Sequence, residues 1–162
     1  MDTKIKDTVD GVKIKTIITE EVIRDGKTIL KQVSENLTPN TGLAAFIKRM
    51  GGDGSTAGFT YIALGTGTTA ATTTDTTLEA EITDSGLARA AATVSYETTT
   101  TTGDTLQLVK YFTATGSKSV TEIGILNDAT TGSLGGRVVK TAVPLEAADI
   151  YAVTYQVLLA RA

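Results

Sequence analysis

The side chains most able to do chemistry in this sequence are four closely spaced carboxylates, Asp75, Glu79, Glu81 and Asp84. Oxygen ligands of this kind bind hard cations such as Ca²⁺. Their spacing does not follow the EF-hand loop, however, and acidic residues in the first turn of a helix also serve as caps and complement the helix dipole. We therefore expect these carboxylates to play a capping role and assign no metal site to them.

A second candidate is the glycine-rich run Gly65-Thr66-Gly67-Thr68-Thr69, which suggests a phosphate-binding loop. A P-loop needs a lysine after its glycines, and a dinucleotide site needs a third glycine and a following helix. Neither pattern is complete here. We interpret the run as the exit from a strand into a loop.

Composition removes much of the common enzyme repertoire. The chain has no Cys and no His, which excludes thiol nucleophiles, Cys/His zinc sites, Ser-His-Asp triads and imidazole acid–base chemistry. There is no Trp for stacking sugars, and the five Tyr and three Phe are better explained as core residues. We expect a protein that is not an enzyme, with no catalytic residue, cofactor or metal.

Charge and hydropathy also limit the partners. The 15 basic and 18 acidic residues give a net charge of -3, and no basic run is present to follow a phosphate backbone. The opening residues Met1–Asp7 lack the apolar core of a signal peptide, and no apolar stretch approaches the roughly 20 residues that span a bilayer. We expect no nucleic-acid or membrane partner and synthesis in the cytoplasm.

Alternating apolar residues and abundant Thr predict a mostly β chain. Val12–Ile18 alternates as a half-buried strand, and Asp25-Gly26 within Val22–Leu30 is typical of a hairpin turn. Further strands are predicted at Phe59–Leu64, Leu87–Glu97, Thr105–Thr113, Val120–Leu126, Gly136–Val143 and Ile150–Leu159. About eight such strands predict an antiparallel β-sandwich or barrel, formed by one domain over residues 1–162.

One short amphipathic helix is predicted. Capping side chains and a proline lie in Thr38–Thr41, and Gly51-Gly52 ends the pattern. Apolar residues at helical spacing, expected to form the buried stripe, are Leu43, Phe46, Ile47 and Met50. We expect this helix to cover one end of a sheet.

Two smaller features complete the local expectations. Thr76-Thr77-Leu78-Glu79 has the spacing of a capping box, which predicts one helical turn that tucks Leu78 and Ile82 inward. Arg89 and Arg137 each interrupt a strand of small or apolar residues. Such residues usually extend or pair on an exposed face, and an inter-subunit contact is the alternative.

Three stretches together resemble small structural proteins of tailed-bacteriophage virions. They are Asn36–Leu43, then Tyr61–Ala70 continuing through Asp75 to Glu81, and finally Val120–Asn127 with Gly132-Ser133-Leu134 and Arg137. The resemblance implies a virion component, as a tail-fibre, collar or baseplate adaptor or as a capsid decoration protein. The lack of a repetitive shaft favours a compact adaptor or a head decoration protein. Within it, Ile123-Gly124-Ile125 implies close backbone approach to a strand or another subunit, with a β-bulge as the alternative.

The resemblance and the absence of catalytic groups lead to one leading hypothesis and two alternatives. We expect a non-enzymatic virion protein that forms a homo-oligomer, a trimer, and docks on other capsid or tail proteins. Residues 1–10 are charged and poorly patterned, which suits a docking arm. The alternatives are a carbohydrate-binding or carbohydrate-cleaving module that engages host-cell glycans, and a tail-tube protein that stacks as hexameric rings.

Overall fold

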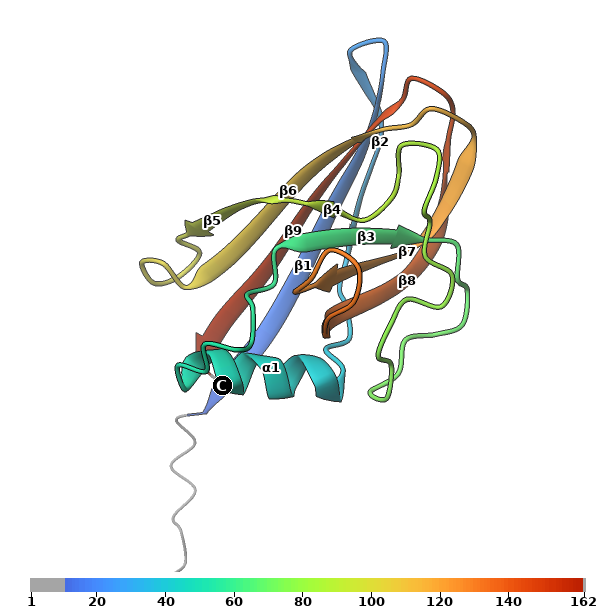
Figure 1. The fold of residues 1–162 in the computed structure, drawn as a ribbon. Coiled ribbons are helices and arrows are strands. Elements are labelled where there is room, and N and C mark those ends of the chain that lie inside the picture. The colour runs from blue at the N-terminus through green and yellow to red at the C-terminus, as the bar shows by residue number, and fades with distance from the viewer. Residues whose placement is uncertain (1–10, 162) are drawn as a thin grey trace, which may run out of the picture.

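Residues 11–161, which the computed structural model describes, form nine strands and one helix (Figure 1). In chain order these are β1 (Val12–Arg24), β2 (Lys27–Ser34), α1 (Asn40–Met50), β3 (Tyr61–Gly65), β4 (Ala90–Ala91), β5 (Thr93–Glu97), β6 (Thr105–Thr113), β7 (Lys118–Leu126), β8 (Leu134–Leu145) and β9 (Ile150–Arg161). The docking arm predicted for residues 1–10 lies outside the described residues.

The strands form two antiparallel sheets. The larger sheet has the order β2-β1-β9-β6-β5, and the smaller sheet has the order β4-β3-β7-β8. Strands hold 51% of the residues and the helix 7%, so the predicted mostly β fold is confirmed. Because neither sheet closes on itself, the architecture is a sandwich and not a barrel.

Two local predictions illustrate how the sequence directs the sheets. Asp25 and Gly26 both adopt positive φ, 50° and 74°, and join β1 to β2 as the predicted hairpin turn. The single strand predicted at Leu87–Glu97 is instead divided. Its first part, β4, pairs with β3 in the smaller sheet, whereas β5 pairs with β6 in the larger one. The chain thus crosses between the sheets around Ala92.

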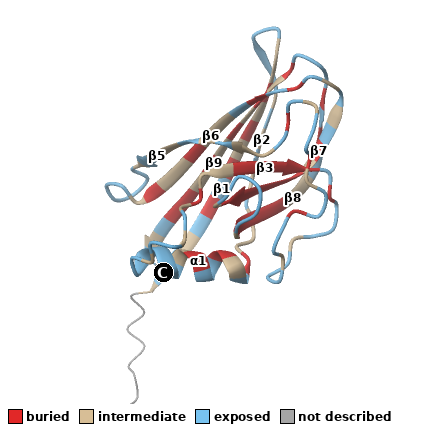
Figure 2. Ribbon diagram, in the orientation of Figure 1, coloured by how far each residue is buried: buried red, intermediate tan, exposed pale blue. Residues whose placement is uncertain are grey.

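The core lies between the two sheets and follows the alternation of each strand (Figure 2). Ile18 on β1 and Tyr155 on β9 are fully buried partners in the larger sheet. Ile62 and Ile123 are their fully buried counterparts in the smaller sheet. The opposite face of the smaller sheet is not left to solvent. Ala63 there packs with Leu78 from the long loop 66–89 in a second, smaller apolar cluster.

A buried ion pair joins the two sheets inside this core. Lys140 Nζ on β8 lies 2.8 Å from Glu20 Oε2 on β1, and both side chains are almost completely excluded from solvent. Gln32 and the Tyr151 hydroxyl also donate to the Glu20 carboxylate. Burial raises the pKa of Glu20 and lowers that of Lys140, because desolvation disfavours both charged forms. The close contact offsets part of that cost and holds the two sheets in register.

The predicted helix is confirmed, but of its predicted buried stripe only Phe46 packs against the core. Small residues, Gly42 and Ala45, face the sandwich instead, because an added Cβ on Gly42 would lie only 2.8 Å from the Gly135 carbonyl oxygen. This close approach turns Ile47 and Met50 outward, where they are 63% and 80% exposed. The helix begins after Pro39 without a side-chain cap. Within residues 11–161 no helix has the length and apolar character to cross a membrane.

An Arg–Asp pair ties the turn between β8 and β9 to the end of β1. Arg24 donates from Nε and Nη2 to the two carboxylate oxygens of Asp149, at 2.7 and 2.8 Å. The N–H of Glu146 donates to the same carboxylate. The hydrogen bonds from Arg24 lower the pKa of Asp149 from 3.8 to about 2.

The close packing of α1 predicts a steric penalty at Gly42. The Gly42→Ala variant should lose about 1–3 kcal/mol of unfolding free energy, because the new methyl group would force α1 away from Gly135. Gly58→Ala is the matched control, since an added Cβ there meets no atom within 4 Å. Urea denaturation of both variants measures the difference. Equal stabilities would show that α1 is not held at this contact.

Asp149 predicts an acid dependence of stability. Because its pKa is lower in the folded chain, its ionised form stabilises the fold above about pH 4, and this stabilisation is lost as pH falls towards 2. The Asp149→Asn variant lacks it at every pH. The gap in unfolding free energy between the wild-type chain and this variant should therefore shrink between pH 4 and pH 2, measured by denaturant titration. A gap independent of pH would contradict the pairing.

Candidate functional site

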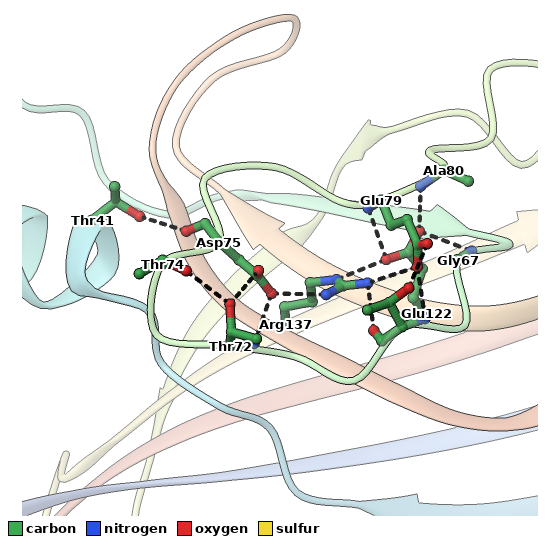
Figure 3. A network of polar contacts seen from close by, with 10 residues as sticks. Thr41, Gly67, Thr72, Thr74, Asp75, Glu79, Ala80, Glu122 and Arg137 are labelled. Carbon is green, nitrogen blue, oxygen red and sulfur yellow. Dashed lines mark hydrogen bonds and ion pairs between the residues drawn. The ribbon is translucent and has the colours of Figure 1, made fainter.

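A buried carboxylate, Glu122, is the centre of a polar cluster on the outer face of the smaller sheet (Figure 3). Ile123 and Ile125 on β7 point into the core, so Glu122, at the alternate parity, points to the opposite face. Its side chain is fully buried. The carboxylate accepts hydrogen bonds from the backbone N–H groups of Gly67 at 3.1 Å, Glu79 at 3.1 Å and Ala80 at 2.8 Å.

Arg137 on β8 completes the cluster. Its Nε donates to Glu122 at 2.8 Å and its Nη1 to Asp75, also at 2.8 Å. Its Nη2 donates to the carbonyl of Thr69 at 3.1 Å and lies 3.5 Å from Glu79 Oε2. Although burial favours the neutral form, the contacts with Asp75 and Glu122 outweigh it and raise the pKa of Arg137. The guanidinium is a permanently charged, enclosed anchor.

The prediction of an exposed face for Arg137 is wrong, since only 3% of its side chain is accessible. It sits opposite Gly124 in the β7–β8 ladder, under the loop 66–89. Gly124 has no side chain to fill this space, and the Leu78 side chain from the loop would lie 2.7 Å from an added Cβ. The close approach at Gly124 therefore comes from this loop, whereas the neighbouring bulge falls between Ile125 and Leu126.

The glycine-rich run does hold an anion, but the anion belongs to the chain itself. The N–H of Gly67 donates to Glu122, and an added Cβ on Gly67 would lie 2.6 Å from the Glu122 carboxylate. An added Cβ on Gly65 would also collide with the Glu122 carboxylate. The interpretation of Gly65–Thr69 as a strand exit is confirmed, because β3 ends at Gly65. What the glycines permit is the internal docking of Glu122.

The four carboxylates considered as cation ligands are each paired with basic residues. Asp75 and Glu79 contact Arg137, whereas Glu81 accepts from Arg89 at 2.6 Å and Asp84 from Lys118 at 3.0 Å. Within residues 11–161 no group of three or more acidic residues is arranged to hold a metal ion. Asp75, Glu79 and Asp84 attach the loop 66–89 to β7 and β8, whereas Glu81 pairs within the loop.

Arg89 anchors the other end of the loop 66–89. Besides its two contacts with Glu81, its Nη1 donates to the carbonyls of Asp128 at 3.1 Å and Thr131 at 2.8 Å. The side chain is 9% exposed. Arg89 thus pairs within its own chain and joins the loop 66–89 to the β7–β8 turn.

The capping-box prediction at Thr76–Glu79 is wrong. No helical turn forms there, and the Glu79 carboxylate accepts from the backbone and hydroxyl groups of Thr69 instead. The N–H groups that a helix would leave unpaired bind Glu122. The inward placement of Leu78 and Ile82 is nevertheless confirmed, since both are 5% exposed. The Glu122 carboxylate therefore satisfies the N–H groups that the predicted cap would have bound.

Three stretches that lie far apart in the sequence meet at this cluster: Asn36–Leu43, Tyr61–Glu81 and Val120–Arg137. Leu37, from the first, exchanges both backbone hydrogen bonds with Arg137, and the Thr41 hydroxyl donates to the Leu134 carbonyl at 3.2 Å. The second stretch supplies Gly67 and Asp75, and the third supplies Glu122. Segments separated by tens of residues therefore form one packed unit.

Sequence reasoning missed Glu122, although a signal for it was present. In the predicted strand Val120–Leu126, apolar residues occupy both parities. Such a strand is buried on both faces, so a charge within it must be buried and paired. The partner is 15 residues away on β8 and could not be chosen from the sequence alone.

A second feature is an apolar groove of about 570 Å³ between α1 and the larger sheet. Val12, Ile14 and Leu159 line it from the sheet, and Ile47 and Met50 from α1. The three sheet residues share the inward parity of Ile18, but within residues 11–161 the element that faces them is α1 and not the second sheet. Contiguous exposed apolar surface of this kind marks an interaction site.

No protein-family model, curated protein or solved structure matches the chain. A function must therefore be inferred from the arrangement of its residues. Two features are available for that purpose: the closed polar cluster around Glu122 and Arg137, and the open apolar groove beside α1.

The polar cluster predicts a large loss of stability when Arg137 is truncated. Arg137→Met should cost about 3–5 kcal/mol of unfolding free energy, because it leaves Glu122 and Asp75 without their counter-charge. Lys31→Met, which removes the more exposed pair with Glu21, is the control and should cost less than about 1 kcal/mol. Hydrogen exchange at Gly67 and Ala80 should also accelerate in Arg137→Met alone. Similar losses in both variants would contradict an anchoring role.

Proposed function

We propose that the protein is a non-enzymatic structural component of a tailed-bacteriophage virion that works as a homo-oligomer. It docks on other capsid or tail proteins as a compact adaptor or decoration module. The observation that carries the proposal is the convergence of the three stretches that resemble phage virion proteins. They build one buried unit around Glu122 and Arg137, which supports treating them as a single structural motif.

The chemistry of this unit supports a scaffold role. Its acids and bases satisfy one another, and every buried side-chain nitrogen or oxygen atom within residues 11–161 has a hydrogen-bond partner. A catalytic group needs at least one polar atom free to meet a substrate. The charged side chains of the cluster are instead directed at the chain's own loop.

The groove beside α1 supports association. Exposed large apolar residues of α1, β1 and β9 line it, and these elements meet at the end of the sandwich where β1 begins and β9 ends (Figure 1). An assembly that covers them would remove this surface from water without any change in fold. The glycan-binding alternative gains no comparable support. The two exposed tyrosines of the described chain, Tyr96 and Tyr111, lie on opposite faces of the larger sheet and cannot form one stacking platform.

The proposal predicts an oligomer in solution and a fixed number of copies on a virus particle. Light scattering with size-exclusion chromatography should give a multiple of 16.8 kDa, with a trimer as the expected state. An averaged electron-microscopy map of the parent virion should contain density that fits the sandwich. Hundreds of copies would indicate decoration or a tube, and about a dozen an adaptor. A strict monomer at high concentration, together with absence from purified particles, would refute the proposal.

A further inference from the structure

We propose that the apolar groove beside α1 receives the N-terminal segment Met1–Asp10 of a second copy of the chain. The inference rests on the proposed function for the existence of an oligomer and names the contact that holds it together. It follows from the lining of the groove, the unpaired edge of β1 and the sequence of the segment.

The groove has an apolar lining and is open to solvent, so a peptide segment can enter it. Val12 and Leu159 are 71% and 54% exposed on the sheet side, and Ile47 and Met50 are still more exposed than Leu159 on the helix side. Tyr96 on β5 closes the far end of the lining. A volume of about 570 Å³ accommodates several medium-sized side chains. A short segment with a few apolar residues would fill it.

The edge of β1 beside the groove offers main-chain partners to such a segment. β2 pairs with β1 only from Ile18 onward, whereas β9 pairs with it from Val12. Along Val12–Ile17, the described chain therefore supplies a ladder on one side of β1 alone. Half of the backbone N–H and C=O groups of these residues point to the open side. An extended peptide can add there as a strand while its side chains enter the groove.

The segment Met1–Asp10 has the matching side chains. Its apolar residues, Met1, Ile5 and Val9, recur every fourth position, with Asp, Lys and Thr between them. All three fall on one face of an extended strand, which they share with Thr3 and Asp7, because all five numbers have one parity. Ten extended residues reach about 33 Å, enough to extend from one copy into the groove of the next. The segment joins the described chain at Gly11, directly before groove residue Val12.

Filling of the groove by the chain's own segment is disfavoured by charge. The segment would have to reverse at Asp10-Gly11, a two-residue turn that fixes the pairing of the residues on either side. In that register Lys6 lies opposite Lys15, and like charges directly opposite each other are destabilising. A segment from a second copy is free of this register, and a trimer in which each copy passes its arm to the next forms a closed symmetric ring.

Engineered disulfides in the full chain test the proposal, since the chain has no cysteine of its own. The variant Ile5→Cys with Ile47→Cys should form disulfide-linked oligomers in most molecules under mild oxidation. The control, Ile5→Cys with Ile29→Cys, carries its second cysteine on an equally accessible residue of β2, away from the groove. It should remain at least tenfold less cross-linked. Non-reducing electrophoresis and thiol counting measure both.

The outcomes separate this inference from the proposed function. Intrachain disulfides in the Ile47 variant, or equal cross-linking in the control, would overturn docking in a second copy. Deletion of residues 1–10 should reduce the oligomer to a monomer with an unchanged circular dichroism spectrum. An oligomer that survives deletion would overturn the inference and leave the proposed function standing. A monomeric full-length chain would overturn both. Ile47→Asp, on an exposed helix position, should weaken assembly as deletion does.

Discussion

The contact between Glu122 and Arg137 is the interaction on which the smaller sheet depends. Burying these two charged side chains costs free energy, because both lose their contact with water. Asp75 and three backbone N–H groups from one loop compensate for that cost. The loop 66–89 is thereby fixed over the outer face of the sheet, where Leu78 packs on Ala63. Without the pair, that face would have neither its cover nor its polar partners.

Buried charges in this chain are paired, whereas several large apolar side chains are left exposed to solvent. Inside the sandwich even a lysine is paired, as the Lys140–Glu20 contact between the two sheets illustrates. At the α1 end, by contrast, Met50 and Val12 remain open to solvent. The interior is otherwise apolar, as in most folds, and its few buried charges are paired. The apolar surface at the α1 end is the exception, and such surface marks an interaction site.

The sequence predicts the features that depend on neighbours along the chain. Alternation locates most strands, and Asp25-Gly26 identifies its hairpin, because both depend on a few adjacent residues. The buried face of α1 is not predictable this way, since a glycine contact with Gly135, 93 residues distant, overrides the apolar stripe. The partners of Glu122 have the same character. The apolar residues on both faces of its strand indicate that Glu122 is buried. Its partners Arg137 and Gly67 are identified only by the β7–β8 register and by the position of the loop.

The position of β9 constrains how the chain can be made. β9 is the last of the nine strands to leave the ribosome, yet it lies in the middle of the larger sheet, between β1 and β6. The hairpins β1–β2 and β5–β6 are therefore synthesised before β9 and keep open edges until β9 pairs with both. A chain interrupted before Ile150 would leave these two hairpins of the larger sheet unconnected.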